Sequence, residues 1–293
     1  MTTTTNTVTT SPDAQAGRQT RWEEEARFFD QAAEHVDEAR LPIDPLTLAR
    51  YSRPVLRKRF NKEFRFRVLG GLAGKTLLDV GCGDGHNAVM FAKMGARVTG
   101  LDVSPGAVRI ARRRAEVNGV SELTTFICSP VETAELAPDS FDIVWADAIL
   151  HHVLAELELV LRRLASWAKP SGLLMFAEPV NRANALRRLR SMIPVDVEAT
   201  PGERPLVKAE LDLLERYVPD LASRHYGFFG RLDQFILTNL NYERSSTARR
   251  AIVNAIDLVD YALLSLPLVK RLGGVCVMYG HPHKTLLTEP DRG

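Results

Sequence analysis

The sequence predicts an α/β fold in which helices cover both faces of a mostly parallel sheet. Three observations predict it. Apolar runs of strand length alternate with helical patterns from about residue 75 to 180, a glycine-rich turn follows the first run, and a last strand-like run lies near residue 275. Strands that alternate with helices pair in parallel, because each helix carries the chain back across one face of the sheet.

Seven apolar segments have the length and composition of strands. They are residues 75–80, 96–101, 124–128, 141–146, 173–177, 223–229 and 275–279. After the second segment, Ser104 is a good helix N-cap, Pro105 suits the first helical position, and Asn118-Gly119 ends the helix. An amphipathic pattern over residues 154–168 predicts a further helix, which a proline and a glycine end.

Further segments are expected before, within and after this sheet. The expected division is a disordered, threonine-rich tail over 1–20, N-terminal helices over 21–70, a core over 71–283 and a second tail over 284–293. Within the core, helical insertions are expected at about 181–222 and 232–272. Prolines break the first insertion.

The composition is that of a soluble globular protein. Of the 293 residues 45% are hydrophobic, and the formal net charge of +2 gives no general attraction to nucleic acid. No apolar run reaches the about 18 residues of a membrane span, and the N-terminus lacks the parts of a secretory signal. Cys82, Cys128 and Cys276 lack metal-ligand spacing. We therefore expect a cytoplasmic protein with no metal site and no membrane partner.

The glycine-rich turn after the first predicted strand is the most informative feature. Residues 77–85 read Leu-Leu-Asp-Val-Gly-Cys-Gly-Asp-Gly, and a helical pattern begins at about His86. Glycine lets a backbone approach a ligand closely, and the N-terminus of the next helix offers N–H groups to an anion such as a carboxylate. The second strand ends in Asp102, where an acid can hold the two hydroxyls of a ribose. Together these features predict a site for a ligand with a ribose and an anionic group.

The glycine spacing separates two classes of such sites. A nicotinamide-dinucleotide site uses G-x-G-x-x-G, but here the third glycine comes one residue early and His86 stands in its place. The G-x-G-x-G form after Leu-Asp-Val, together with Asp102, resembles motif I of class I S-adenosylmethionine-dependent methyltransferases. The resemblance spans roughly residues 70–283. It implies a Rossmann-like sheet of seven strands with a final antiparallel pair, and S-adenosyl-L-methionine as the cofactor.

The resemblance implies a role for each residue of the turn. Asp79 would orient this loop or meet the amino group of the cofactor. The backbone that would contact the methionine part is that of Gly81, Cys82, Gly83 and Gly85.

The adenosine part would lie against the ends of the second and third strands. The resemblance implies that Asp102 binds the ribose and that Val103 lies near the adenine. The family often places an acid after the third strand to receive the adenine amino group, but this sequence has Pro130 there. Glu132 would serve in its place, or else a backbone carbonyl would.

Two histidines and a glutamate follow the fourth and fifth strands. His151 and His152 stand in a Leu-His-His-Val run that resembles motif IV of many small-molecule methyltransferases. A histidine suits a general base for a hydroxyl acceptor, since its unperturbed pKa is about 6.5. We prefer His152 as the base, because two adjacent residues at a helix start are not expected both to face the pocket. Glu178 ends the fifth strand at the same edge. Three roles are open for it: binding the substrate, orienting a histidine, or standing exposed before the turn at Pro179.

The expected acceptor is a small molecule. The resemblance implies that the first insertion is a cap over the substrate. His225, Tyr226 and Arg231 follow this cap and are candidates for substrate binding. Arginine-rich stretches in the N-terminal helices and after the fifth strand suit an anionic acceptor, or form solvated helix faces. Nucleic acid is not the expected partner, since the Asn/Asp-Pro-Pro-Tyr/Phe and Pro-Cys motifs of base methylation are absent.

The leading hypothesis is therefore O-methylation of a small molecule with a histidine base. Three alternatives stay open: N- or C-methylation of a small metabolite, RNA methylation, and a protein that binds the cofactor for a different reaction. The N-terminal helices and the cap are similar to those of enzymes that tailor natural products or sugars.

Overall fold

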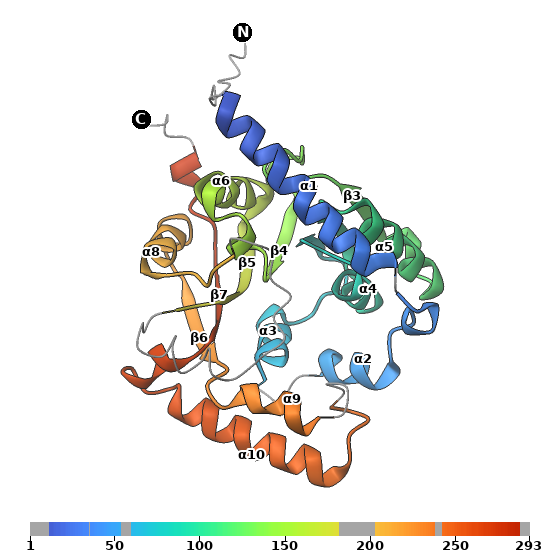
Figure 1. Ribbon diagram of the computed structural model, residues 1–293, viewed down its shortest axis with the longest axis vertical. Helices are drawn as coiled ribbons and strands as arrows, with labels where there is room; N and C mark the ends of the chain where they lie inside the picture. Colours follow the sequence, from blue (N-terminus) through green and yellow to red (C-terminus); the bar gives the residue numbers. More distant parts are fainter. Residues whose placement is uncertain (1–11, 35, 54–59, 182–202, 238–241, 288–293) are drawn as a thin grey trace.

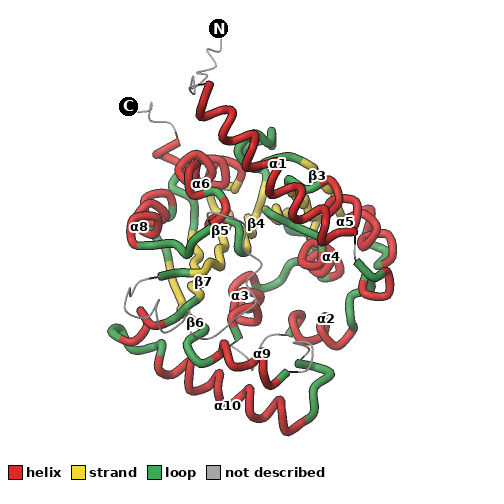
Figure 2. Tube along the Cα trace, in the orientation of Figure 1, coloured by secondary structure: helices red, strands yellow, loops and turns green. Residues whose placement is uncertain are grey.

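A seven-stranded sheet lies at the centre of the protein, with helices on both sides of it (Figures 1 and 2). The computed structural model describes residues 12–34, 36–53, 60–181, 203–237 and 242–287. The strands are β1 (Thr76–Val80), β2 (Arg97–Asp102), β3 (Thr124–Cys128), β4 (Phe141–Asp147), β5 (Ala168–Pro179), β6 (Ala222–Tyr226) and β7 (Val275–Gly280). Their order across the sheet is β3-β2-β1-β4-β5-β7-β6.

The sheet has the expected mixture of parallel and antiparallel strands. β1 to β5 pair in parallel, and β7 pairs antiparallel with both β5 and β6. This confirms the predicted Rossmann-like fold class. The chain reverses its direction across the sheet between β1 and β4, and ligands bind outside the carboxyl ends of strands at such a point.

Adjacent residues of β1 enter two separate hydrophobic cores. Leu78 and Val80 pack on one face with α6 (Leu157–Trp167) and α8 (Lys208–Tyr217). Leu77 packs on the other face with α3, α4 and α5. These three helices span Asn61–Leu69, His86–Lys93 and Pro105–Val117. Side chains that alternate between faces let one strand hold both layers of helices.

The N-terminal helices are present, but the tail before them is shorter than expected. α1 (Pro12–Glu34) is helical over the last part of the predicted disordered tail, and residues 1–11 lie outside the described residues. A short 3₁₀ turn (Glu38–Arg40) and α2 (Pro45–Ser52) follow. Asp30 of α1 accepts hydrogen bonds from Ser104 Oγ (2.6 Å) and the Gly106 N–H (2.7 Å). α1 is therefore fixed to the start of α5, where Ser104 also acts as the predicted N-cap.

Two predicted boundaries shift for clear local reasons. α6 ends at Trp167 because β5 already begins at Ala168. Pro170 and Gly172, which were expected to end the helix, therefore lie inside β5, at the point where its pairing with β4 changes register. β6 ends at Tyr226 instead of residue 229. The carboxylate of Asp260 accepts the N–H groups of the three residues after Tyr226, which takes them out of the strand ladder.

The second insertion connects β6 to β7, and part of the first lies outside the described residues, at 182–202. The helices of the second insertion are η5 (Gly230–Leu232), α9 (Asp233–Ile236), α10 (Thr247–Leu263) and η7 (Val269–Leu272). The remaining short 3₁₀ helices are η2 (Ser121–Leu123), η3 (Leu150–His152), η4 (Leu154–Glu156) and η8 (Lys284–Leu287). Among the described helices, none combines the length and the apolarity needed to cross a bilayer.

Candidate active site

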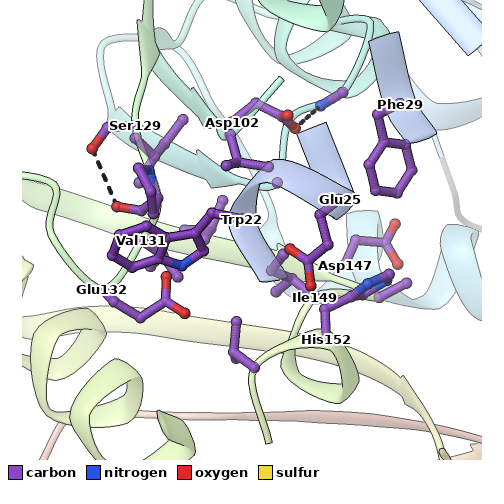
Figure 3. A pocket seen from close by; sticks show the side chains of 18 of the residues that line it. Trp22, Glu25, Phe29, Asp102, Ser129, Val131, Glu132, Asp147, Ile149 and His152 are labelled. Carbon is purple, nitrogen blue, oxygen red and sulfur yellow. Dashed lines mark hydrogen bonds between the residues drawn. The ribbon is translucent and has the colours of Figure 1, made fainter. Parts of the chain in front are cut away.

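A cavity of about 300 Å³ lies at the carboxyl ends of β1, β2 and β4, where the strand order reverses. Five segments of the chain supply its walls (Figure 3). The lining side chains and backbone include Trp22, Glu25, Phe29, Gly81, Gly83, Asp102, Val103, Pro130, Glu132, Asp147, Ile149, His151 and His152. The predicted cofactor turn and the predicted catalytic histidines therefore meet in one cavity.

Hydrogen bonds tie the glycine turn to the end of β2. The N–H groups of Gly81 and Cys82 both donate to the Leu101 carbonyl, at 2.8 and 3.0 Å. The Gly83 N–H donates to Asp102 Oδ2 at 2.8 Å, and the Ser104 N–H donates to Oδ1 at 2.9 Å. Burial raises the pKa of the Asp102 carboxyl, and these N–H groups act against that rise. The acid is thus held in a fixed orientation at the cavity wall.

Not every residue of the turn reaches the cavity. Gly81 and Gly83 line it, whereas Cys82 and Gly85 do not. A Cβ on Gly85 would lie 2.7 Å from the Cβ of Ala111, so this glycine lets α5 pack closely against the turn. The Cys82 side chain is buried beside Gly100, where an added Cβ would come within 2.9 Å of its sulfur. Cys82 and Gly85 therefore pack against neighbouring elements, and neither is part of the described cavity lining.

Asp79 lies beneath the turn and also stays out of the cavity lining. It is 1% exposed, and burial raises the pKa of its carboxyl well above the usual range. The carboxylate accepts a hydrogen bond from the Ala88 N–H in α4. This position fits the first of its two expected roles, orientation of the loop.

Glu132 does line the cavity, next to Pro130 and Val103. Its buried carboxylate forms an ion pair with Arg21 of α1. Glu132 therefore lies in the cavity wall, with Arg21 as its partner.

One wall comes from α1, which sequence reasoning missed. Trp22, Glu25 and Phe29 line the cavity beside Asp102, Glu132 and His152 (Figure 3). Burial raises the pKa of Glu25 to about 7. The three residues are spaced i, i+3, i+7, which places them on one face of a helix. That spacing was a usable signal, but nothing in the sequence places α1 over the cavity.

His151 is held by a buried carboxylate. Its Nδ1 lies 2.8 Å from Glu178 Oε2, and the Glu178 side chain is completely buried. The other oxygen of Glu178 accepts the N–H groups of Ile149 (2.9 Å) and Leu150 (2.8 Å). The alternative in which Glu178 stands exposed is therefore wrong, and the glutamate instead orients a histidine.

The two histidines have opposite electrostatic environments. Burial disfavours charge on His151, but the hydrogen bond and the charge of Glu178 outweigh it and raise the pKa of this histidine. Burial and the neighbouring His151 lower the pKa of His152 to about 4. Both histidines line the cavity, so the expectation that only one would face it is wrong.

Glu203 approaches both rings from the segment before α8. Its Oε1 lies 3.0 Å from His152 Nδ1, and its Oε2 lies 3.7 Å from His151 Nε2. Within the described part of the chain, these three side chains form the group whose ligand atoms are close enough together to hold a metal ion. Sequence reasoning missed Glu203, since it follows a proline-rich stretch with no clear pattern.

Two of the predicted substrate residues, His225 and Tyr226, are not part of the described cavity lining. His225 and Tyr226 are buried in β6, on the far side of β7 from β5, and Tyr226 packs near Phe64. Arg231 follows in η5, but its side chain is not among the described ones. The cause is the sheet order, which puts β6 at the edge opposite β3.

Comparison with known proteins identifies the domain that builds this cavity. Residues 78–176 match the family model described as a methyltransferase domain. The chain contains a methyltransferase domain. Over 111 residues it is 39% identical to a ubiquinone biosynthesis O-methyltransferase of Methylobacterium sp. (strain 4-46), covering 38% of this chain and 43% of that protein. A protein of the same name from Nitrobacter winogradskyi is 36% identical over 140 residues, covering 48% and 51%. The chain spans about half the length of these relatives, or less.

A solved structure agrees with the fold of the methyltransferase domain. N-methyltransferase NodS from Bradyrhizobium japonicum WM9, in complex with S-adenosyl-L-homocysteine, has a TM-score of 0.50 and 13% sequence identity, with 88% of this chain and 98% of that chain covered. At this identity the likeness concerns the fold alone. Residues 78–176 thus match a methyltransferase domain, and the fold of the chain is similar to that of this solved methyltransferase.

Proposed function

We propose that this chain transfers a methyl group from S-adenosylmethionine to a hydroxyl oxygen of a small-molecule acceptor. The relatives named as O-methyltransferases support the reaction class. The observation that carries the proposal is the His151–Glu178 pair at the cavity wall, because a hydroxyl acceptor must lose a proton and an imidazole held by a carboxylate can take it.

The cofactor would lie along the glycine turn. Gly81 and Gly83 leave room for the methionine part, and the carboxylate of Asp102 faces the cavity with its orientation fixed by backbone N–H groups. A ribose with two vicinal hydroxyls can donate hydrogen bonds to such an acid. Val103 and Glu132 would then flank the adenine.

The base that we propose is His151, in place of His152. With Nδ1–H donated to Glu178, Nε2 carries the lone pair, 3.7 Å from Glu203 Oε2. It would accept the acceptor's proton as the oxygen attacks the methyl carbon and the carbon–sulfur bond breaks. The imidazolium that forms is stabilised by the charge of Glu178. His152 suits the task less well, because its pKa of about 4 makes it a weak base near neutral pH.

Among the described residues that line the cavity, there is no arginine or lysine to bind an anionic acceptor. The arginines after β5 fall within 182–202, outside the described residues. In the N-terminal helices, Arg50 pairs with Glu63 and Glu243, and Arg65 pairs with Asp147. We therefore propose a neutral hydroxyl compound as the acceptor.

The test measures release of S-adenosylhomocysteine with a panel of hydroxyl compounds, starting with catechol, and identifies the methylated atom by mass spectrometry. His151→Asn is expected to lower turnover by about 10²–10⁴-fold, with S-adenosylhomocysteine binding unchanged by calorimetry. His152→Asn is the matched control and should lose much less. Full turnover in His151→Asn would overturn the base assignment, and a product methylated on nitrogen or carbon would overturn the reaction class.

A further inference from the structure

α10 carries its polar and apolar residues the opposite way round from an ordinary surface helix. Over residues 251–263, every exposed residue is apolar, and two of the three fully buried residues are aspartates, Asp257 and Asp260. The exposed residues are Ala251, Ile252, Ala255, Leu258, Val259 and Ala262. A helix that folds only to cover a core shows its polar face to water instead.

The buried aspartates fix this orientation. Asp260 accepts the N–H groups of Gly227 (2.9 Å), Phe228 (3.2 Å) and Phe229 (2.9 Å), which follow β6. Turning α10 to bury its apolar face would break all three hydrogen bonds and leave buried N–H groups without partners. The outward apolar face is therefore built into the fold.

The apolar surface continues beyond the helix and is not covered by the described chain. Leu258 and Val259 are 56% and 51% exposed, and Leu266 and Leu268, in the turn that follows, are 51% and 84% exposed. α10 runs along the outer edge of the molecule, with no other drawn element on its outer side (Figure 1). Contiguous exposed apolar surface of this kind marks an interaction site.

The charges at the ends of this surface indicate what it binds. Arg249 and Arg250 lie in the first turn of α10, and Lys270 and Arg271 lie just after the exposed leucines. Between residues 246 and 273 the acidic residues are Asp257 and Asp260, both buried. The exposed leucines are thus followed directly by two cations, Lys270 and Arg271, whereas Arg249 and Arg250 mark the start of α10 on the side that carries the buried aspartates. An interfacial helix on an anionic lipid layer has this arrangement, because the apolar side chains enter the headgroup boundary and the cations meet phosphates.

A second copy of the chain fits this surface less well. In a twofold contact along the helix, antiparallel α10 helices would bring Arg249 and Arg250 onto the partner's Lys270 and Arg271, and parallel helices would bring each pair onto itself. Either arrangement places like charges together, which disfavours association.

We propose that α10 and residues 265–268 dock on an anionic lipid surface. This contact lies on the bilayer without spanning it, so it agrees with the lack of a spanning helix among the described ones. It departs from the expectation of no membrane partner, which considered spanning segments alone. The insertion that holds α10 leaves the sheet at the carboxyl end of β6, the same edge at which the cavity opens. Docking would therefore bring the cavity edge toward the lipid layer, whatever reaction the cavity performs.

The test is co-sedimentation of the full chain with vesicles of phosphatidylcholine, alone or mixed in equal parts with phosphatidylglycerol. We expect binding to the mixed vesicles that weakens with added salt. The double variant Leu258→Asp, Val259→Asp should bind at least about tenfold more weakly. Replacing Lys270 and Arg271 by glutamine should weaken binding by about fivefold per cation.

Matched controls separate the surface from general effects. Leu46→Asp introduces a charge at a leucine on α2 that is 54% exposed, and Arg109→Gln removes an exposed cation on α5, so both should bind as the wild type does. Unchanged circular dichroism and S-adenosylhomocysteine binding would show that the α10 variants are folded. Failure to bind mixed vesicles, or equal binding by the aspartate variant, would overturn the proposal. So would a dimer in ultracentrifugation that Leu258→Asp dissociates while vesicles stay unbound.

Discussion

Replacing Gly85 by alanine is expected to cost about 2–5 kcal/mol of folding free energy. Gly85 has a φ of +77°, and the left-handed region costs an L-residue about 1–2 kcal/mol. The added Cβ would also lie 2.7 Å from the Ala111 Cβ and 2.8 Å from its Cα. Overpacking of this kind costs a further about 1–3 kcal/mol, because α5 must move away from the turn.

Two other glycines serve as matched controls. Gly119 has a φ of +68° and nothing within 4 Å of an added Cβ, so Gly119→Ala isolates the backbone term of about 1–2 kcal/mol. Gly83 has a φ of +51° and equal space, but it lines the cavity. Gly83→Ala should therefore lose S-adenosylhomocysteine affinity in addition to the same backbone term.

Urea unfolding at constant pH measures the stabilities, and calorimetry measures the affinities of the folded variants. If Gly85→Ala and Gly119→Ala lost the same free energy of unfolding, the packing argument would be refuted. If Gly85→Ala weakened cofactor binding as strongly as Gly83→Ala, the division of the turn into packing and ligand positions would be wrong.

Three further predictions concern ionisable residues. In Glu178→Gln the side-chain oxygen still accepts the two backbone N–H groups, and the amide N–H₂ donates to His151 Nδ1, so Nε2 must carry the proton. Turnover should fall by about 10²–10⁴-fold with unchanged S-adenosylhomocysteine binding. A smaller loss of turnover would count against the His151–Glu178 pair as the base. Asp102→Ala should weaken S-adenosylhomocysteine binding by roughly 10- to 100-fold in calorimetry, and an unchanged affinity would exclude a ribose contact. Burial raises the pKa of the Glu25 carboxyl from 4.5 to about 7. Between these two pH values the folded state keeps a proton that the unfolded state releases, so the free energy of unfolding falls as pH rises. Glu25→Gln should remove that fall in urea unfolding near pH 5 and pH 8, whereas a parallel loss in the variant would show that another group titrates.

The parts of this protein that local patterns specify were predictable. The strand boundaries of β3 and the N-cap at Ser104 follow from residue type and spacing, and both agree with the structure. The glycine turn and Asp102 come together because they follow neighbouring parallel strands. In each case the determining interactions lie within one element or between strands of known order.

The parts that depend on distant contacts were not predictable. Trp22 is a plain helical residue until α1 packs across α5 and over the cavity. Orientation of a histidine was one of three roles expected of Glu178, but no local pattern shows that His151 is the histidine it holds. β6 ends early because of Asp260 in α10, which no pattern near Tyr226 reveals.

The wall contributed by α1 also has a consequence for synthesis of the chain. The cavity combines Trp22 with Glu132 and His152, so it joins positions separated by more than 100 residues. On a ribosome, α1 emerges before the sheet, and its partner surface is complete only after the loop beyond β4 has left the exit tunnel. The complete cavity does not exist on a shorter nascent chain, and Trp22 and Phe29 stay without these partners for that interval.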